Sequence, residues 1–106
     1  MRNKEGLTRG EEEVMHILWK LGKATVSDVI ELMAPPKPKY TTIATFIKIL
    51  ERKGFVSHVQ IGKGYLYTPA IEREEYAKTV AKNLLHSYFD GSVSNMVSFF
   101  SKQENI

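Results

Sequence analysis

Residues 40–53 have two chemically distinct sides when they are placed on a helix, and this segment constrains the fold more than any other. At about 100° per residue, its apolar side chains fall within one arc of about 100°. These side chains are Ile43, Phe46, Ile47 and Leu50. The opposite arc is polar, with hydroxyl groups first and cations later: Thr41, Thr42, Thr45, Lys48 and Arg52. The sequence therefore predicts a helix that buries one side and presents the other to solvent or to a partner.

Two short β-prone segments follow this helix directly. Residues 55–61 and 65–68 are rich in Val, Ile and Tyr, and Gly62, Lys63 and Gly64 join them. Branched and aromatic side chains favour strands, and a glycine-rich link of this length favours a hairpin. We expect a small β-hairpin with Lys63 at its tip.

Two further helices are predicted before residue 40. Thr8 and Glu11 form a capping-box pattern at the start of a helix over 8–21. Thr25 can cap a second helix, which we expect to end at Pro35 and Pro36. Three helices followed by a hairpin give the order of a winged helix-turn-helix domain, in a chain that is mainly α with one small β-hairpin.

The remaining residues predict two helices, over 72–89 and 93–102, with more apolar surface than so short a segment can bury against itself. We interpret residues 1–70 as a winged helix DNA-binding domain and residues 71–106 as a helical dimerisation region. The charge fits this division, since residues 1–70 carry a net charge of +4 and residues 71–106 a net charge of −1. The residues expected to form the dimer are Tyr76, Val80, Leu84, Tyr88, Met96, Val97 and Phe100.

Composition excludes several classes of protein. The chain has 106 residues, enough for one core or one core with a small appendage, and it contains no cysteine. Disulfides and thiolate metal sites are therefore excluded. No apolar stretch approaches the ~18 residues of a membrane span, and no signal peptide is evident. We expect a cytoplasmic protein that has no contact with a membrane.

Enzymatic function is not predicted either. The histidines His16, His58 and His86 lack the spacing of metal ligands. The serines of the C-terminal region have no base and orienting acid near them in sequence, and no glycine-rich phosphate loop follows a strand. We therefore expect no catalytic residue, no metal and no cofactor.

The polar side of residues 40–53 has the chemistry of a DNA-reading helix. The second helix of a helix-turn-helix enters the major groove, which is ~12 Å wide. Hydroxyl groups can contact base edges and phosphates, while cations such as Lys37 and Lys39 in the preceding loop can approach the backbone. The predicted DNA-binding residues are Lys39, Tyr40, Thr41, Thr42, Thr45, Lys48, Arg52, Lys63 and Tyr65. The alternative is a winged helix that contacts protein or RNA without operator specificity.

The same residues carry a resemblance to a known family. The segments Tyr40–Phe46, Leu50–Val56 and Gly64–Pro69, with Leu7-Thr8 and Glu12–Met15 before Leu18-Trp19, resemble the penicillinase repressor family of BlaI/MecI-type winged-helix transcriptional regulators. The resemblance covers nearly the whole chain. It implies a sequence-specific repressor that binds palindromic double-stranded operator DNA as a homodimer and controls β-lactam resistance genes.

The resemblance also implies how such a repressor is inactivated. In this family a protease cleaves the C-terminal region, which weakens the dimer. By position, the cleavage would fall at Phe99 and Phe100, and Phe99 stands where the family's well-known site has Asn. An inactivating protease is therefore an expected partner.

Overall fold

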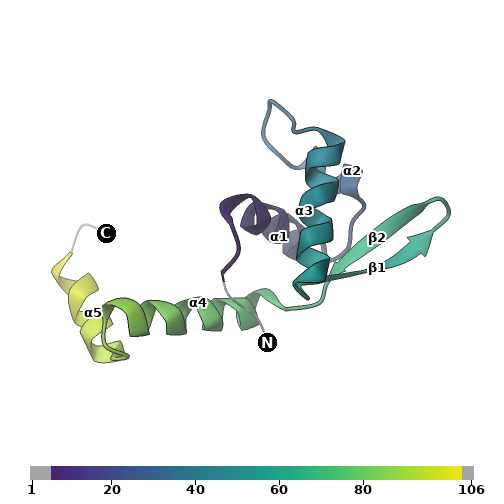
Figure 1. The fold of residues 1–106 in the computed structure, drawn as a ribbon. Coiled ribbons are helices and arrows are strands. Elements are labelled where there is room, and N and C mark those ends of the chain that lie inside the picture. The colour runs from purple at the N-terminus through teal and green to yellow at the C-terminus, as the bar shows by residue number, and fades with distance from the viewer. Residues whose placement is uncertain (1–5, 104–106) are drawn as a thin grey trace. The chain divides into compact units, whose positions relative to one another are not determined.

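The computed structural model describes residues 6–103 and confirms the predicted winged-helix order (Figure 1). Three helices precede a two-stranded antiparallel sheet, and two helices follow it. The elements are α1 (Arg9–Leu21), α2 (Val26–Glu31), α3 (Tyr40–Arg52), β1 (Val56–Ile61), β2 (Gly64–Pro69), α4 (Arg73–Tyr88) and α5 (Val93–Lys102). Between residues 6 and 103, no helix is both long enough and apolar enough to cross a membrane.

Side-chain caps set where the first two helices begin. The Thr8 hydroxyl accepts a hydrogen bond from the Glu11 amide, and the Glu11 carboxylate accepts one from the Thr8 amide, as the capping-box pattern predicts. Thr25 and Asp28 form the same reciprocal pair at the start of α2. Each box satisfies amide groups that have no partner within the helix.

α2 ends earlier than predicted, at Glu31 rather than at the two prolines. The ammonium group of Lys37 donates hydrogen bonds to the carbonyl oxygens of Ile30, Glu31 and Met33, at 3.1, 2.8 and 2.7 Å. These bonds satisfy carbonyl groups that a longer helix would have used itself. The chain therefore leaves the helix before it reaches Pro35.

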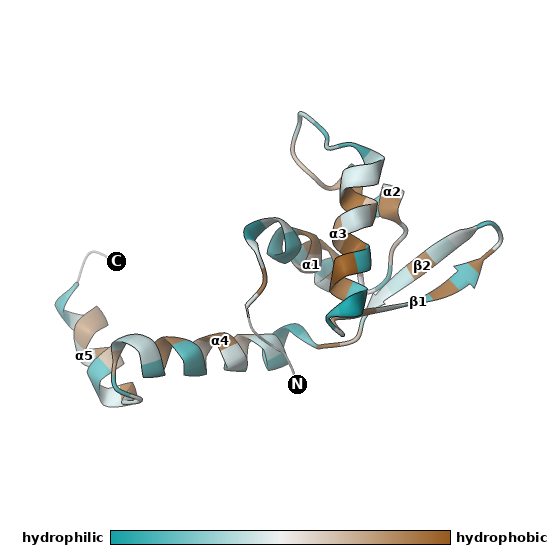
Figure 2. Cartoon of the chain, viewed as in Figure 1, coloured by the Kyte–Doolittle hydropathy of each residue, from teal (hydrophilic) through white to brown (hydrophobic). Residues whose placement is uncertain are grey.

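The core of the first three helices and the hairpin is built from the apolar sides that the sequence predicts. Ile43, Ile47 and Leu50 of α3 are essentially inaccessible to solvent, and hydropathy colouring shows the apolar residues of the three helices (Figure 2). They share this core with side chains from α1, α2 and the hairpin: Val14, Met15, Leu18, Val29, Phe55 and Val56. Burial of the apolar side fixes the rotation of α3, so its polar side faces outward.

The hairpin is held by more than its own pairing. β1 and β2 pair from Val56 with Pro69 to Ile61 with Gly64, which leaves a two-residue turn at Gly62 and Lys63. The loop before α2 adds a third short partner, because Ala24 and Tyr67 exchange backbone hydrogen bonds of 2.9 and 2.8 Å. The base of the hairpin is therefore anchored to the helix-turn-helix, and its outer part projects away from the three helices (Figure 1).

The chain divides into two compact units between Arg73 and Glu74, three residues after the boundary expected from sequence. The second unit consists of most of α4 and all of α5. Asp90 and Gly91 have positive φ angles of 52° and 74° at the turn between these helices, and the Ser92 hydroxyl caps α5. The ring of Phe89 lies 5.5 Å from that of Phe99, which joins the end of α4 to α5.

Candidate nucleic-acid interface

The outward side of α3 is a continuous polar surface. All five polar residues predicted for this side are exposed: Thr41, Thr42, Thr45, Lys48 and Arg52. The hydroxyl groups lie in the first half of the helix and the cations in the second half. Hydroxyl groups can donate or accept at base edges, whereas cations attract phosphates. The outward side of α3 is therefore suited to binding a polyanion that exposes polar groups within a groove.

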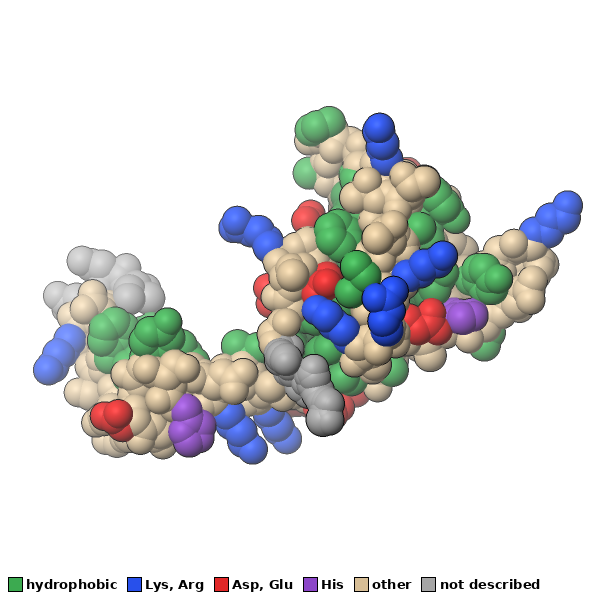
Figure 3. All heavy atoms as spheres, in the orientation of Figure 1, with side chains coloured by type: hydrophobic (Ala, Val, Ile, Leu, Met, Phe, Trp, Pro, Cys, Tyr) green, Lys and Arg blue, Asp and Glu red, His purple; other side chains and the backbone are tan. Residues whose placement is uncertain are grey.

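Cations without ion-pair partners among the described residues lie on this surface and beside it. Lys39, Lys48, Arg52 and Lys63 form no ion pair with any residue between 6 and 103. Lys and Arg side chains lie over α3 and at the tip of the hairpin in the space-filling view (Figure 3). Since no carboxylate neutralises them directly, these four charges are available to a negatively charged partner.

Lys53 differs from these cations because a buried carboxylate holds it. Its ammonium group lies 2.7 Å from the carboxylate of Glu11, whose side chain is 5% exposed. Burial raises the pKa of Glu11, but the hydrogen bond from Lys53 and the bonds from Thr8 lower it, and the net result lies below the usual 4.5. This pair joins the start of α1 to the end of α3, so Lys53 holds the helix in place.

Lys37 is not among the available cations, contrary to the sequence prediction that it approaches the DNA backbone. Its ammonium group is occupied by the three carbonyl groups at the end of α2. Lys39, two residues later, is exposed and its side chain makes no cap hydrogen bond to α3. Spacing in the sequence does not distinguish the two lysines, but the fold of the loop does.

The hairpin and the start of α3 meet at a hollow of about 360 Å³. It brings together three of the predicted residues, Tyr40, Lys63 and Tyr65. It also includes polar residues that sequence reasoning missed, Thr25 and Ser27, from the start of α2. The sequence identifies Thr25 only as a helix cap, and no signal in it places these two residues opposite the hairpin. The hollow therefore offers several donors to one anionic group of a ligand.

An interaction between the hairpin and α3 fixes the position of both. A ring nitrogen of His58 on β1 lies 2.6 Å from the carboxylate of Glu51 on α3. The His58 ring also meets the Tyr65 ring edge to face, with centroids 4.9 Å apart. Burial, with the negative charge of Glu51, raises the pKa of the Tyr67 hydroxyl group. These contacts hold the base of the hairpin against α3.

Comparison with known proteins identifies the family. The sequence pattern of the penicillinase repressor family matches residues 7–106. The chain belongs to the penicillinase repressor family. It is 27% identical to the penicillinase repressor of Bacillus licheniformis over 109 residues, covering all of this chain and 84% of that protein. It is 28% identical to the methicillin resistance regulatory protein MecI of Staphylococcus aureus strain N315 over 103 residues, covering 94% of this chain and 82% of that protein.

A solved structure of a family member has the same fold. It is the solution structure of Bacillus licheniformis BlaI in its monomeric form, in complex with the blaP half-operator. The TM-score is 0.57 at 28% identity, over 72% of this chain and 94% of that chain. The winged helix of this chain is therefore a fold that the family uses.

The second unit of the present chain exposes apolar side chains. Most of the residues predicted for a dimer are exposed: Val80, Leu84, Tyr88, Val97 and Phe100. Met96 is half-buried and Tyr76 is buried within the chain. Phe99 and Phe100 both lie inside α5, with rings 5.5 Å apart. In the part of the chain from 6 to 103, no group of three His, Asp or Glu side chains is arranged to hold a metal ion.

Proposed function

We propose that this chain is a sequence-specific DNA-binding transcriptional repressor. One observation carries the proposal: the exposed polar side of α3 is accompanied by four cations without ion-pair partners among residues 6–103, Lys39, Lys48, Arg52 and Lys63. The complex of Bacillus licheniformis BlaI with a half-operator supports the same use of the fold here.

In this proposal α3 lies in the major groove and the hairpin lies along the adjacent backbone. Thr41, Thr42, Thr45 and Lys48 would meet base edges, because they form the outward side of α3. Phosphates would be held by Lys39, Arg52 and Lys63. Tyr65 supports the wing through its contact with His58. The hollow between α2, α3 and the hairpin, with Thr25 and Ser27, is a natural position for one phosphate.

We further propose that two chains bind one operator through their second units. Val80, Tyr88 and Val97 are 43%, 75% and 55% exposed, an unusual load of apolar surface for a small helical unit. A second copy of the same unit would cover it in a twofold arrangement. Two half-sites, one for each α3, would then be expected about one DNA turn apart, ~34 Å.

The names of the relatives support a role in resistance to β-lactams. One relative is named as a repressor of penicillinase and the other as a regulator of methicillin resistance, and we infer that this chain represses genes of that kind. Cleavage between Phe99 and Phe100 would inactivate it by shortening the second unit. Because both residues lie within α5, a protease could reach this peptide bond only after local unfolding of the helix.

The proposal is tested by competition between the DNA upstream of the chain's own gene and a random duplex. Wild-type protein should prefer the upstream DNA. The double variant Lys48→Gln/Arg52→Gln should lose binding to both, whereas the matched control Lys78→Gln/Lys82→Gln, which removes two exposed cations of α4, should bind as wild type does. Equal loss in both double variants would mean that net charge, rather than α3, determines binding. Absence of DNA binding in the wild type would favour a winged helix that contacts protein or RNA.

A further inference from the structure

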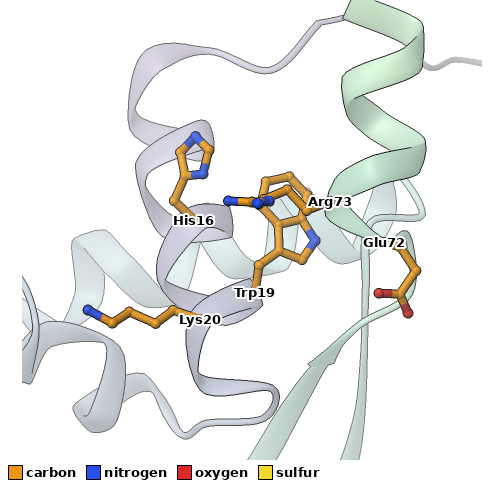
Figure 4. Close-up of a pocket in the computed structure, with 5 residues that line it drawn as sticks. All are labelled: His16, Trp19, Lys20, Glu72 and Arg73. Atoms are coloured by element: carbon orange, nitrogen blue, oxygen red, sulfur yellow. The ribbon is translucent and has the colours of Figure 1, made fainter.

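The first unit has a second hollow, of about 510 Å³, which is separate from the polar side of α3 and from the hairpin. His16, Trp19 and Lys20 of α1 line it together with Glu72 and Arg73, where the chain enters α4 (Figure 4). The volume is that of a pocket for a small organic molecule. We propose that this hollow binds a small aromatic carboxylate.

The aromatic part of the ligand is matched by two rings. The indole nitrogen of Trp19 donates a 2.8 Å hydrogen bond to the carbonyl oxygen of Ile71, which fixes the orientation of the indole. The ring of His16 meets the indole edge to face, with centroids 5.4 Å apart and an interplanar angle of 71°. A planar ligand can pack against such a pair of rings without reordering them first, because aromatic rings favour edge-to-face and offset contacts.

Two cations and one carboxylate line the hollow, so its charged side chains are net positive and favour an anionic ligand. Neither Lys20 nor Arg73 forms an ion pair with any described residue from 6 to 103. The guanidinium group of Arg73 lies with Trp19 and His16 at the centre of the close-up, while Lys20 and Glu72 extend away on opposite sides (Figure 4). Arginine binds a carboxylate through two parallel hydrogen bonds. Arg73 is therefore the primary anchor, and Lys20 adds a second, longer-range attraction.

The chain supplies its own reporter for a binding experiment, because Trp19 is its one tryptophan. In a ¹⁵N-labelled sample the indole group gives a single crosspeak. Benzoate should shift this crosspeak saturably, and benzamide, which has the same shape without the charge, should bind at least about tenfold more weakly. Acetate, which lacks the ring, should also bind more weakly than benzoate.

Substitutions identify which cations bind the carboxylate of the ligand. Arg73→Gln should lower the affinity for benzoate about tenfold, the usual effect of losing one charge-assisted contact. Lys20→Gln should weaken it less. Lys23→Gln, which removes an exposed cation of the same unit that does not line the hollow, should leave the affinity unchanged, and unchanged backbone crosspeaks would show that each variant folds.

A flat titration with benzoate would overturn the proposal. So would equal affinities for benzoate and benzamide, or an Arg73→Gln affinity within twofold of wild type. The titration contains no DNA, so its outcome does not depend on whether the chain is a repressor.

Discussion

Two lysines before α3 lie two positions apart, yet their ammonium groups have different surroundings. Lys37 donates to three carbonyl oxygens at the end of α2, whereas Lys39 is exposed and forms no ion pair among residues 6–103. We therefore expect Lys37→Met to affect stability and Lys39→Met to affect DNA binding. Methionine keeps most of each side chain's length and removes only the charge and the donors.

The magnitudes follow from these contacts. Removing Lys37 leaves the last carbonyl groups of a six-residue helix without their side-chain donor, which costs about 1 kcal/mol at this exposed position. For a domain of this size, such a loss lowers Tm by about 4–8 °C. Removing Lys39 eliminates one phosphate contact per chain, which makes the slope of log K against log salt concentration shallower by about 0.9 for each chain bound.

Two assays separate the effects. Thermal unfolding should show a lower Tm for Lys37→Met and an unchanged Tm for Lys39→Met. DNA titrations at several salt concentrations should show an unchanged slope for Lys37→Met and a shallower slope for Lys39→Met. The reasoning is refuted if Lys37→Met changes the slope as much as Lys39→Met does, because the ammonium group of Lys37 would then contact phosphate rather than α2.

Three other substitutions test separate parts of the interface. Lys63→Gln should weaken binding to upstream and random DNA about equally and reduce the salt slope by ~1 for each chain bound, whereas Thr45→Ala should change the preference among operator variants. Equal losses on specific and random DNA for Thr45→Ala would remove its assigned role in reading bases. Lys53→Met should raise the pKa of Glu11, because the hydrogen bond and the positive charge of Lys53 are lost and only the bonds from Thr8 still oppose the effect of burial. In wild type the low pKa of Glu11 contributes stability above pH about 4.5, and this stability is lost as the pH falls through the folded-state pKa. The acid-induced loss of stability should be smaller in Lys53→Met. Identical profiles of Tm against pH for the two proteins would contradict this prediction.

Local patterns predicted most of the secondary structure. The helix expected over residues 40–53 is observed over 40–52, and the capping box at Thr8 begins α1 as expected. Both depend on interactions within a few residues, which periodicity and side-chain chemistry report directly. The polar side of α3 was predictable for the same reason, since burial of one side determines the other.

Contacts between distant residues were not predictable. The Ala24–Tyr67 bridge, the Glu11–Lys53 pair and the His58–Glu51 hydrogen bond each depend on how the elements pack together. The end of α2 was misplaced for a related reason. Prolines mark where a helix cannot continue, but the Lys37 side chain satisfies the last carbonyl groups before that limit is reached.

In the proposed function, α3 and the cations on and beside it bind operator DNA, with two chains on one site. The most direct test is a titration of wild-type protein on its upstream DNA at 50 and 200 mM salt, with stoichiometry measured in the same experiment. If Lys39, Arg52 and Lys63 each hold one phosphate in both chains, affinity should fall by about 10³-fold between the two salt concentrations, with two chains bound per duplex. Binding that changes by less than about tenfold, or that shows no preference over random duplex, would contradict the account.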